Sequence, residues 1–168
     1  MTSDRDVAAH LANCFDATYR ALGELAPLMG FDPCVVCAHE MSRSFGEVAL
    51  VLREYTGLDP SPLAIIDAVL RRSWSEDPSG TLTLYALAIV VGPRLLVSLR
   101  DALAATSDDV ARAVFSEAQM VTVGQVRRVV GLDPSGTTLE ESRWNQAAQD
   151  LVAMVESDGN ADSFGISR

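Results

Sequence analysis

Apolar residues recur along most of the chain at spacings of three and four, the period of one face of an α-helix. The first such segment covers about residues 4–28, with Ser3 placed to cap it. Its apolar face comprises Val7, Leu11, Cys14, Thr18, Leu22 and Leu25. A second helix is predicted from Pro33 to about Thr56, with Asp32 as its cap, because proline at a first helical position loses no hydrogen bond.

The middle of the chain predicts one further helix and a long apolar segment. The turn at 59–62 introduces a helix that continues to about Trp74. Residues 81–91 are apolar all round, which is typical of a buried central helix. Gly92-Pro93 is expected to kink or break this element, with helix continuing over 94–105.

Two helices are predicted in the last third of the chain. Ser107 is placed to cap a helix over 108–130. Thr137 with Glu140, or Thr138 with Glu141, resembles a capping box for a final helix that ends near Ser157.

The sum of these elements predicts an all-α protein, a single-domain helical bundle of about six helices. The domain is expected to span residues 1–157, followed by a flexible C-terminal tail over 158–168. The expected core includes Leu11, Leu22, Phe45, Val48, Leu52, Leu87, Val90 and Leu96.

The amino-acid composition limits the cellular environment and the binding partners that we expect for this protein. The net charge is −10, and such an acidic surface disfavours binding to nucleic acid or to anionic lipid. All basic residues are arginine, which we interpret as the codon bias of a bacterial genome rich in G and C. The start of the chain does not resemble a secretion signal, and the uncharged stretch 80–93 is too short to span a bilayer. Without a secretion signal, the three cysteines are expected to be reduced. We therefore expect a cytoplasmic protein.

Cys34-Val35-Val36-Cys37 is the sharpest chemical motif. It falls in the first turn of a predicted helix, where free backbone N–H groups and the helix dipole stabilise a thiolate. Such a pair can exchange a disulfide with a substrate. A helical Cys-x-x-Cys resembles the alkylhydroperoxidase D family, in which a histidine follows the second cysteine by four residues, but Met41 occupies that position here.

The same cysteines also fit a purely structural role. Cys34, Cys37, Met41, Phe45, Val48, Leu52 and Tyr55 form one continuous apolar stripe at helical spacing. His39 lies about 160° from Cys37 around the helix axis and is poorly placed to act as its base. Neither a zinc site nor a di-iron site has enough suitably spaced ligands, so we predict no metal, no cofactor and no assigned catalytic residue.

A helix-turn-helix pattern is weakly present over residues 122–135. Its second helix would contain Leu139–Arg143, where two carboxylates accompany one guanidinium, a poor surface for a phosphate-lined groove. Gly57–Ser61 recurs as Gly131–Ser135, which is consistent either with independent use of common helix-stop and helix-start chemistry or with an ancient duplication, and we favour the first.

Three functions are consistent with the sequence. The first is a non-enzymatic interaction or regulatory module that self-associates or binds a protein partner. The second is a thiol-disulfide or peroxide reductase that uses Cys34 and Cys37. The third is a helical pocket for a small apolar ligand, placed beside the interruption at Gly92-Pro93.

Overall fold

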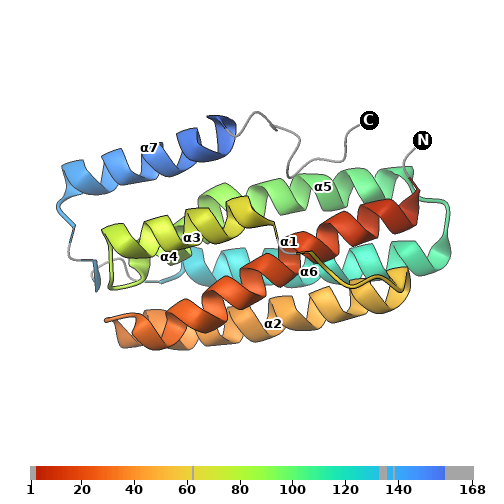
Figure 1. The fold of residues 1–168 in the computed structure, drawn as a ribbon, viewed down its shortest axis with the longest axis horizontal. Helices are drawn as coiled ribbons and strands as arrows, with labels where there is room; N and C mark the ends of the chain where they lie inside the picture. The colour runs from red at the N-terminus through yellow and green to blue at the C-terminus, as the bar shows by residue number, and fades with distance from the viewer. Residues whose placement is uncertain (1–2, 62, 133–135, 138, 158–168) are drawn as a thin grey trace.

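A computed structural model of the chain describes residues 3–61, 63–132, 136–137 and 139–157, in which the regular elements are all helical (Figure 1). In chain order they are α1 (Asp4–Leu25), a 3-10 turn (Ala26–Leu28), α2 (Asp32–Thr56), α3 (Ala64–Glu76), α4 (Thr81–Ala86), a π-helical turn (Leu87–Val91), α5 (Gly92–Ala105), α6 (Asp109–Val130) and α7 (Glu141–Ser157). Since α4, the π-turn and α5 are continuous, these residues form six helices. The prediction of an all-α helical bundle is confirmed.

Four long helices surround the core. α1 and α2 form a hairpin, α2 packs beside α6, α6 beside α5, and α5 completes the ring by contacting α1 (Figure 1). α3 packs on α1 and α4, and α7 lies on the outside against α3 and α4. This arrangement leaves α6 with one face toward the core and the opposite face toward solvent.

The core is built from aliphatic side chains and the three buried phenylalanines Phe15, Phe45 and Phe115. Phe15 of α1 and Phe45 of α2 lie with ring centroids 5.6 Å apart. Seven of the eight predicted core residues are buried, whereas Leu96 is only half-buried. The neighbouring Leu95 and Leu99 are buried instead, because they share a face with Val91 at steps of four residues.

Helix starts follow the predicted chemistry in some places only. Ser3 forms the expected cap, and its hydroxyl accepts from the Asp6 N–H at 3.2 Å. Asp32 was predicted to cap α2 but is its first residue, and the cap position is held by Phe31 without a side-chain bond. Gly57 ends α2 as expected, in the left-handed conformation with φ 71°.

The cap of α6 is Asp108 and not the predicted Ser107. The Asp108 carboxylate accepts from the Val110 and Ala111 N–H groups at 2.8 and 3.3 Å. The hydroxyl of Thr106 accepts from the Asp108 N–H at 3.1 Å, and this local turn places Asp108 rather than Ser107 at the helix start.

Two other predicted boundaries also shift. α3 begins at Ala64, two residues after the predicted opening turn, of which Pro62 lies outside the described residues. α7 begins at Glu141, and the hydroxyl of Thr137 accepts from Leu139 instead of forming a capping box with Glu140. Thr138 and the predicted tail 158–168 lie outside the described residues.

Of the two predicted effects of Gly92-Pro93, a break does not occur, because helix continues without interruption from Thr81 to Ala105. The Gly92 N–H donates to the Leu87 carbonyl, five residues earlier, which defines the π-turn. This wider turn accommodates Pro93, which has no N–H and whose ring would crowd an ordinary helical turn. A Cβ at position 92 would lie 2.6 Å from Val126 Cγ2 and 2.8 Å from the Leu87 oxygen, so the contact with α6 requires glycine.

The combined helix Thr81–Ala105 is long and apolar enough, by length and composition, to cross a membrane. It is the one such helix among the described residues, and 67% of its most apolar window is buried inside the fold. The central helix of a soluble bundle has the same properties.

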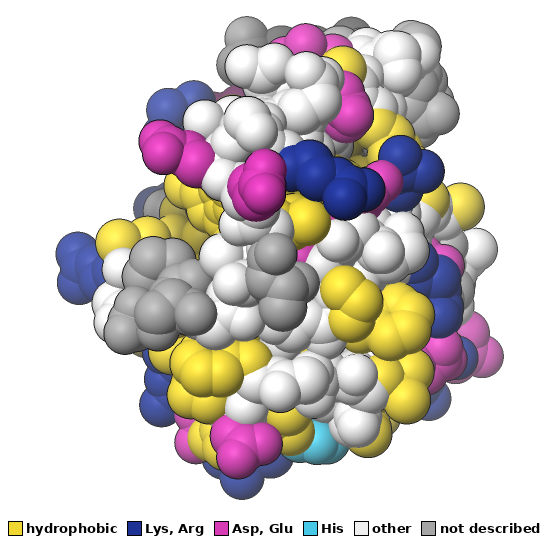
Figure 2. Space-filling view, turned by 90° about the vertical axis from the view of Figure 1, so that its left-hand side faces the viewer, with side chains coloured by type: hydrophobic (Ala, Val, Ile, Leu, Met, Phe, Trp, Pro, Cys, Tyr) yellow, Lys and Arg dark blue, Asp and Glu magenta, His cyan; other side chains and the backbone are white. Residues whose placement is uncertain are grey.

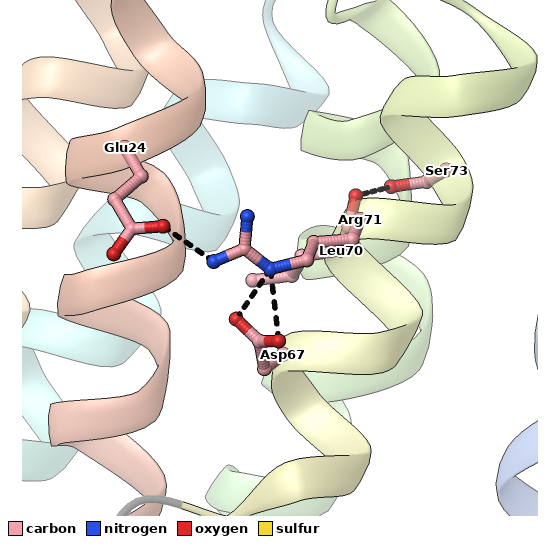
Figure 3. A network of polar contacts seen from close by, with 5 residues as sticks. All are labelled: Glu24, Asp67, Leu70, Arg71 and Ser73. Carbon is pink, nitrogen blue, oxygen red and sulfur yellow. Dashed lines mark hydrogen bonds and ion pairs between the residues drawn. The ribbon is translucent and has the colours of Figure 1, made fainter.

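An arginine on α3 joins this helix to α1 (Figure 3). Arg71 Nη2 lies 2.5 Å from Glu24 Oε2 on α1, and its Nε donates to both carboxylate oxygens of Asp67 at 2.9 Å. The two carboxylates raise the pKa of the Arg71 guanidinium above its usual value. Because all three side chains are at least 41% exposed to solvent, this network orients α3 but contributes little to stability.

Candidate functional site

A cavity of about 380 Å³ lies between the central helix, the end of α6 and the start of α7. From α2 and the central helix it is lined by Cys34, Thr81, Leu84, Tyr85, Ala88 and Ile89. From the end of α6 and beyond it is lined by Val129, Val130, Leu132 and Trp144. None of the lining residues that the structure describes carries a charged side chain, and most of their exposed surface is apolar.

The π-turn forms one wall of this cavity. It supplies Ala88, which is buried, and Ile89, which is 45% exposed beside it. A π-turn holds one residue more than an α-turn, so it bulges locally and interrupts regular packing against the neighbouring helix. The sequence prediction placed an apolar pocket beside Gly92-Pro93, and the cavity is lined by the turn directly before this pair.

Two aromatic side chains are in contact at another wall of the cavity. Tyr85 of α4 and Trp144 of α7 meet edge to face, with centroids 5.3 Å apart and an interplanar angle of 67°. The contact brings together residues nearly sixty positions apart in sequence. Figure 2 views the end of the molecule at which α2 begins and α6 ends, and hydrophobic side chains reach the surface there in several groups.

Polar atoms at the cavity come from a small hydrogen-bonded cluster. The Thr81 hydroxyl lies 3.6 Å from Cys34 Sγ and accepts from the Ser79 hydroxyl at 3.0 Å. The fully buried Asp77 is joined to this cluster, because its carboxylate accepts from the Ser79 N–H at 3.2 Å. The polar groups of the described lining are therefore few: the Thr81 hydroxyl, the Cys34 thiol, and those of the Tyr85 and Trp144 side chains.

The structure places both cysteines of the Cys-x-x-Cys motif in the core. Cys34 is 2% exposed and Cys37 is 3% exposed. Burial raises the pKa of the Cys34 thiol, and burial raises the pKa of Cys37 to about 11 although the positive charge of Arg128 opposes it. A thiol with a raised pKa is a poor nucleophile at neutral pH, so this environment is the reverse of what a reductase requires.

The remaining metal-ligating side chains are scattered. Cys14 is fully buried, and burial raises its pKa to about 12. Its Sγ lies 3.8 Å from His10 Nε2, four residues earlier on α1. His39 is exposed on α2. Among the residues that the structure describes, no three histidine, cysteine or acidic side chains come together to hold a metal.

Thiol reactivity tests the assignment of the cysteines to the core. Freshly reduced native protein is expected to react with Ellman's reagent at least about a hundredfold more slowly than the same protein in denaturant, because thiolate formation and access both require opening of the fold. The measurement is the absorbance released over time in both conditions. Two thiols that react within seconds in the native protein would favour the reductase hypothesis instead.

The helix-turn-helix pattern maps to the end of α6 and to α7. Residues 133–135 of the turn, and with them part of the repeated Gly-Leu-Asp-Pro-Ser segment, lie outside the described residues. α7 packs against α3 and α4, and Glu140, Glu141 and Arg143 are exposed at its start. Among the described residues, two carboxylates therefore accompany one guanidinium at the start of this helix.

The chain was compared with family models, with curated proteins and with solved structures. No family model matches it, and no curated protein or solved structure matches it.

Proposed function

We propose that this protein binds a small, uncharged and largely apolar molecule in the cavity between the central helix, α6 and α7. The observation that carries the proposal is the cavity itself, about 380 Å³ of space with an apolar lining beside the π-turn. Ligand pockets in proteins are concave, mostly apolar and furnished with few polar groups, and this cavity has all three properties.

Its size favours a compact ligand. The volume lies near the lower end of the range of about 300–1,000 Å³ that is common for ligand pockets. A single ring system or a short branched chain fits this space better than an extended lipid. Each methylene that such a ligand buries contributes roughly 0.8 kcal/mol of transfer free energy.

The lining also favours a neutral ligand. No charged side chain is among the described residues that border the cavity, so an ion would lose its hydration without gaining a partner from them. The Thr81 hydroxyl, beside Cys34 Sγ, is the polar group best placed to contact one oxygen of a ligand. A ligand with a single hydroxyl or carbonyl group therefore suits the site.

The other two functions suggested by the sequence stay predictions with less support. Burial and raised pKa values of Cys34 and Cys37 disfavour a reductase. An interaction module remains compatible with ligand binding, because a small ligand can regulate how a protein associates.

Binding of the neutral fluorescent probe N-phenyl-1-naphthylamine tests the proposal. We expect a blue-shifted, saturable emission with a dissociation constant below about 100 µM. Ala88→Phe, which places a ring in the cavity, is expected to weaken binding at least tenfold. Ala104→Phe introduces the same ring at an exposed position of α5 and serves as the matched control, with unchanged binding expected.

A second variant guards against a folding defect in Ala88→Phe. Ile89→Trp narrows the cavity at a residue that is already 45% exposed, so it leaves the core intact. It is expected to weaken probe binding with an unchanged melting temperature. Absence of probe binding to the unmodified protein, or equal affinity in both cavity variants and the control, would overturn the proposal.

A further inference from the structure

The outward face of α6 carries a stripe that no described part of the chain covers. Its residues follow each other at spacings of four, three, four, three and four, and all are exposed: Ala113, Glu117, Met120, Gly124, Arg127 and Gly131. At 100° per residue they fall within about 80° of one another, opposite the buried face formed by Ala111, Phe115, Ala118 and Val129. We refer to these six positions as the α6 stripe.

Two residues of the α6 stripe are energetically unfavourable in an isolated monomer. Met120 is a large apolar side chain that is 70% exposed. Gly124 lies in the interior of a helix, where glycine is less favourable than alanine by roughly 1 kcal/mol. A Cβ at position 124 would have no neighbour within 4 Å, so no contact within the described part of this chain requires glycine there. Glycine at such a site allows another backbone or side chain to approach closely.

The charges of the stripe complement each other in reverse order. Glu117 and Arg127 take part in no ion pair among the described residues, whereas the neighbouring Arg128 is paired with Glu40 of α2. The two lie symmetrically about the position of Thr122, which is midway between them in sequence. A second α6 laid antiparallel across that midpoint would place each Glu117 opposite the Arg127 of the other copy.

The same alignment pairs the remaining positions. Met120 of one copy falls opposite Gly124 of the other, so that a large side chain meets a gap, and Ala113 falls opposite Gly131. Every large or charged member of the stripe thus meets a complementary one under a single two-fold operation, which is the property of an isologous interface.

We propose that the α6 stripe is a dimerisation surface whose occupant is a second copy of this chain, packed antiparallel with Glu117 against Arg127 and Met120 against Gly124. Val123 and the exposed Val130 flank the stripe and extend the apolar surface of the interface. Methionine and arginine are enriched at protein interfaces, in agreement with this assignment. The inference is independent of the cavity and does not require a ligand.

Light scattering coupled to size exclusion, with sedimentation velocity, tests the proposal over about 10–500 µM protein. The unmodified chain is expected to reach twice its 18.0-kDa mass in this range. Glu117→Arg and Arg127→Glu each create two like-charge contacts per dimer and are expected to weaken association at least tenfold. The double reversal restores both contacts with opposite polarity and is expected to restore the dimer.

Gly124→Leu separates association from folding. The added side chain fills the gap that Met120 would occupy, so dimerisation should be lost, while the monomer should melt at the same or a higher temperature. Ala153→Leu, at an exposed position of α7, is the matched control and should leave the dimer intact. A monomer at 500 µM, or a dimer that survives Gly124→Leu and either single reversal, would overturn the proposal.

Discussion

Replacement of Asp77 with alanine is expected to lower the free energy of unfolding by about 3 kcal/mol. Its carboxylate is fully buried and accepts three hydrogen bonds, from the N–H groups of Ser79 and Leu82 and from the Thr137 hydroxyl at 3.0 Å. Loss of the carboxylate leaves these buried donors unpaired, and each unpaired donor costs about 1–3 kcal/mol, of which local relaxation recovers part. Urea unfolding at neutral pH, followed by circular dichroism, measures the change.

The effect on structure should extend beyond α4. Thr137 precedes α7, so its bond to Asp77 ties the chain before α7 to the turn between α3 and α4. Because Trp144 of α7 lines the cavity, Asp77→Ala is also expected to change tryptophan emission. Thr137→Val removes one of the three bonds to Asp77 and also the acceptor of the half-buried Leu139 N–H, and should cost about 1–2 kcal/mol.

Asp67→Ala, on the helix α3 that ends directly before Asp77, provides the matched control. Asp67 is 41% exposed and bonds only to Arg71, so its removal should cost less than about 1 kcal/mol (Figure 3). Equal destabilisation by the two alanine substitutions would show that the buried hydrogen bonds of Asp77 do not carry the stability assigned to them.

Helices were predictable because their signals are local. Ser3 and Gly57 act within one turn of their own helices, and the apolar period that includes Leu11 and Leu52 persists through whole segments. The capping residue was predicted wrongly at the start of α6, where two neighbouring residues are both suitable. Ser107 and Asp108 are equally good caps by type, and only the bond from Asp108 N–H to the Thr106 hydroxyl distinguishes them.

The π-turn could not be predicted, because proline in a helix permits several responses. Pro93 is compatible with a break, a kink or a bulge, and the tight contact of Gly92 with Val126 of α6 favours the bulge. This contact joins positions far apart in sequence. The cavity is lined by Ala88 and Ile89 of this bulge, close to the Gly92-Pro93 pair beside which the sequence suggested a pocket, whereas its other walls had no sequence signal.

Much of the cavity lining is also beyond sequence reasoning. Tyr85 and Trp144 meet only because α7 returns to α4, and no periodicity within either helix indicates that contact. Aromatic residues make up only 6% of the chain. The presence of Tyr85 and Trp144 on two different predicted helices was therefore the one indication of this contact available from the sequence. The cysteine pair was the opposite case, since the apolar stripe and the motif predicted different roles and burial had to decide between them.

Alkaline pH is expected to destabilise the protein by several kcal/mol, on account of the buried thiols. Burial raises the pKa of Cys14 to about 12 and that of Cys37 to about 11, whereas thiols in an unfolded chain titrate near 8.5. Above that pH the unfolded state releases protons that the native state retains. Stability is therefore fully present below about pH 8.5 and falls as pH rises toward 11–12, by up to 1.36 kcal/mol per unit for each thiol.

The composition makes this measurement unusually clean. The sequence contains no lysine, so tyrosine is the other side chain that titrates in the same range, and there are three of them. Urea midpoints at pH 8, 9, 10 and 10.5, with a phosphine reductant to prevent disulfide formation, give the slope. A variant with alanine at all three cysteines should be less stable at pH 8, because small cavities remain, but should lose most of the slope. A midpoint that stays constant from pH 8 to pH 10.5 in the unmodified protein would show that its thiols titrate normally, and would return the Cys34–Cys37 pair to consideration as a reactive site.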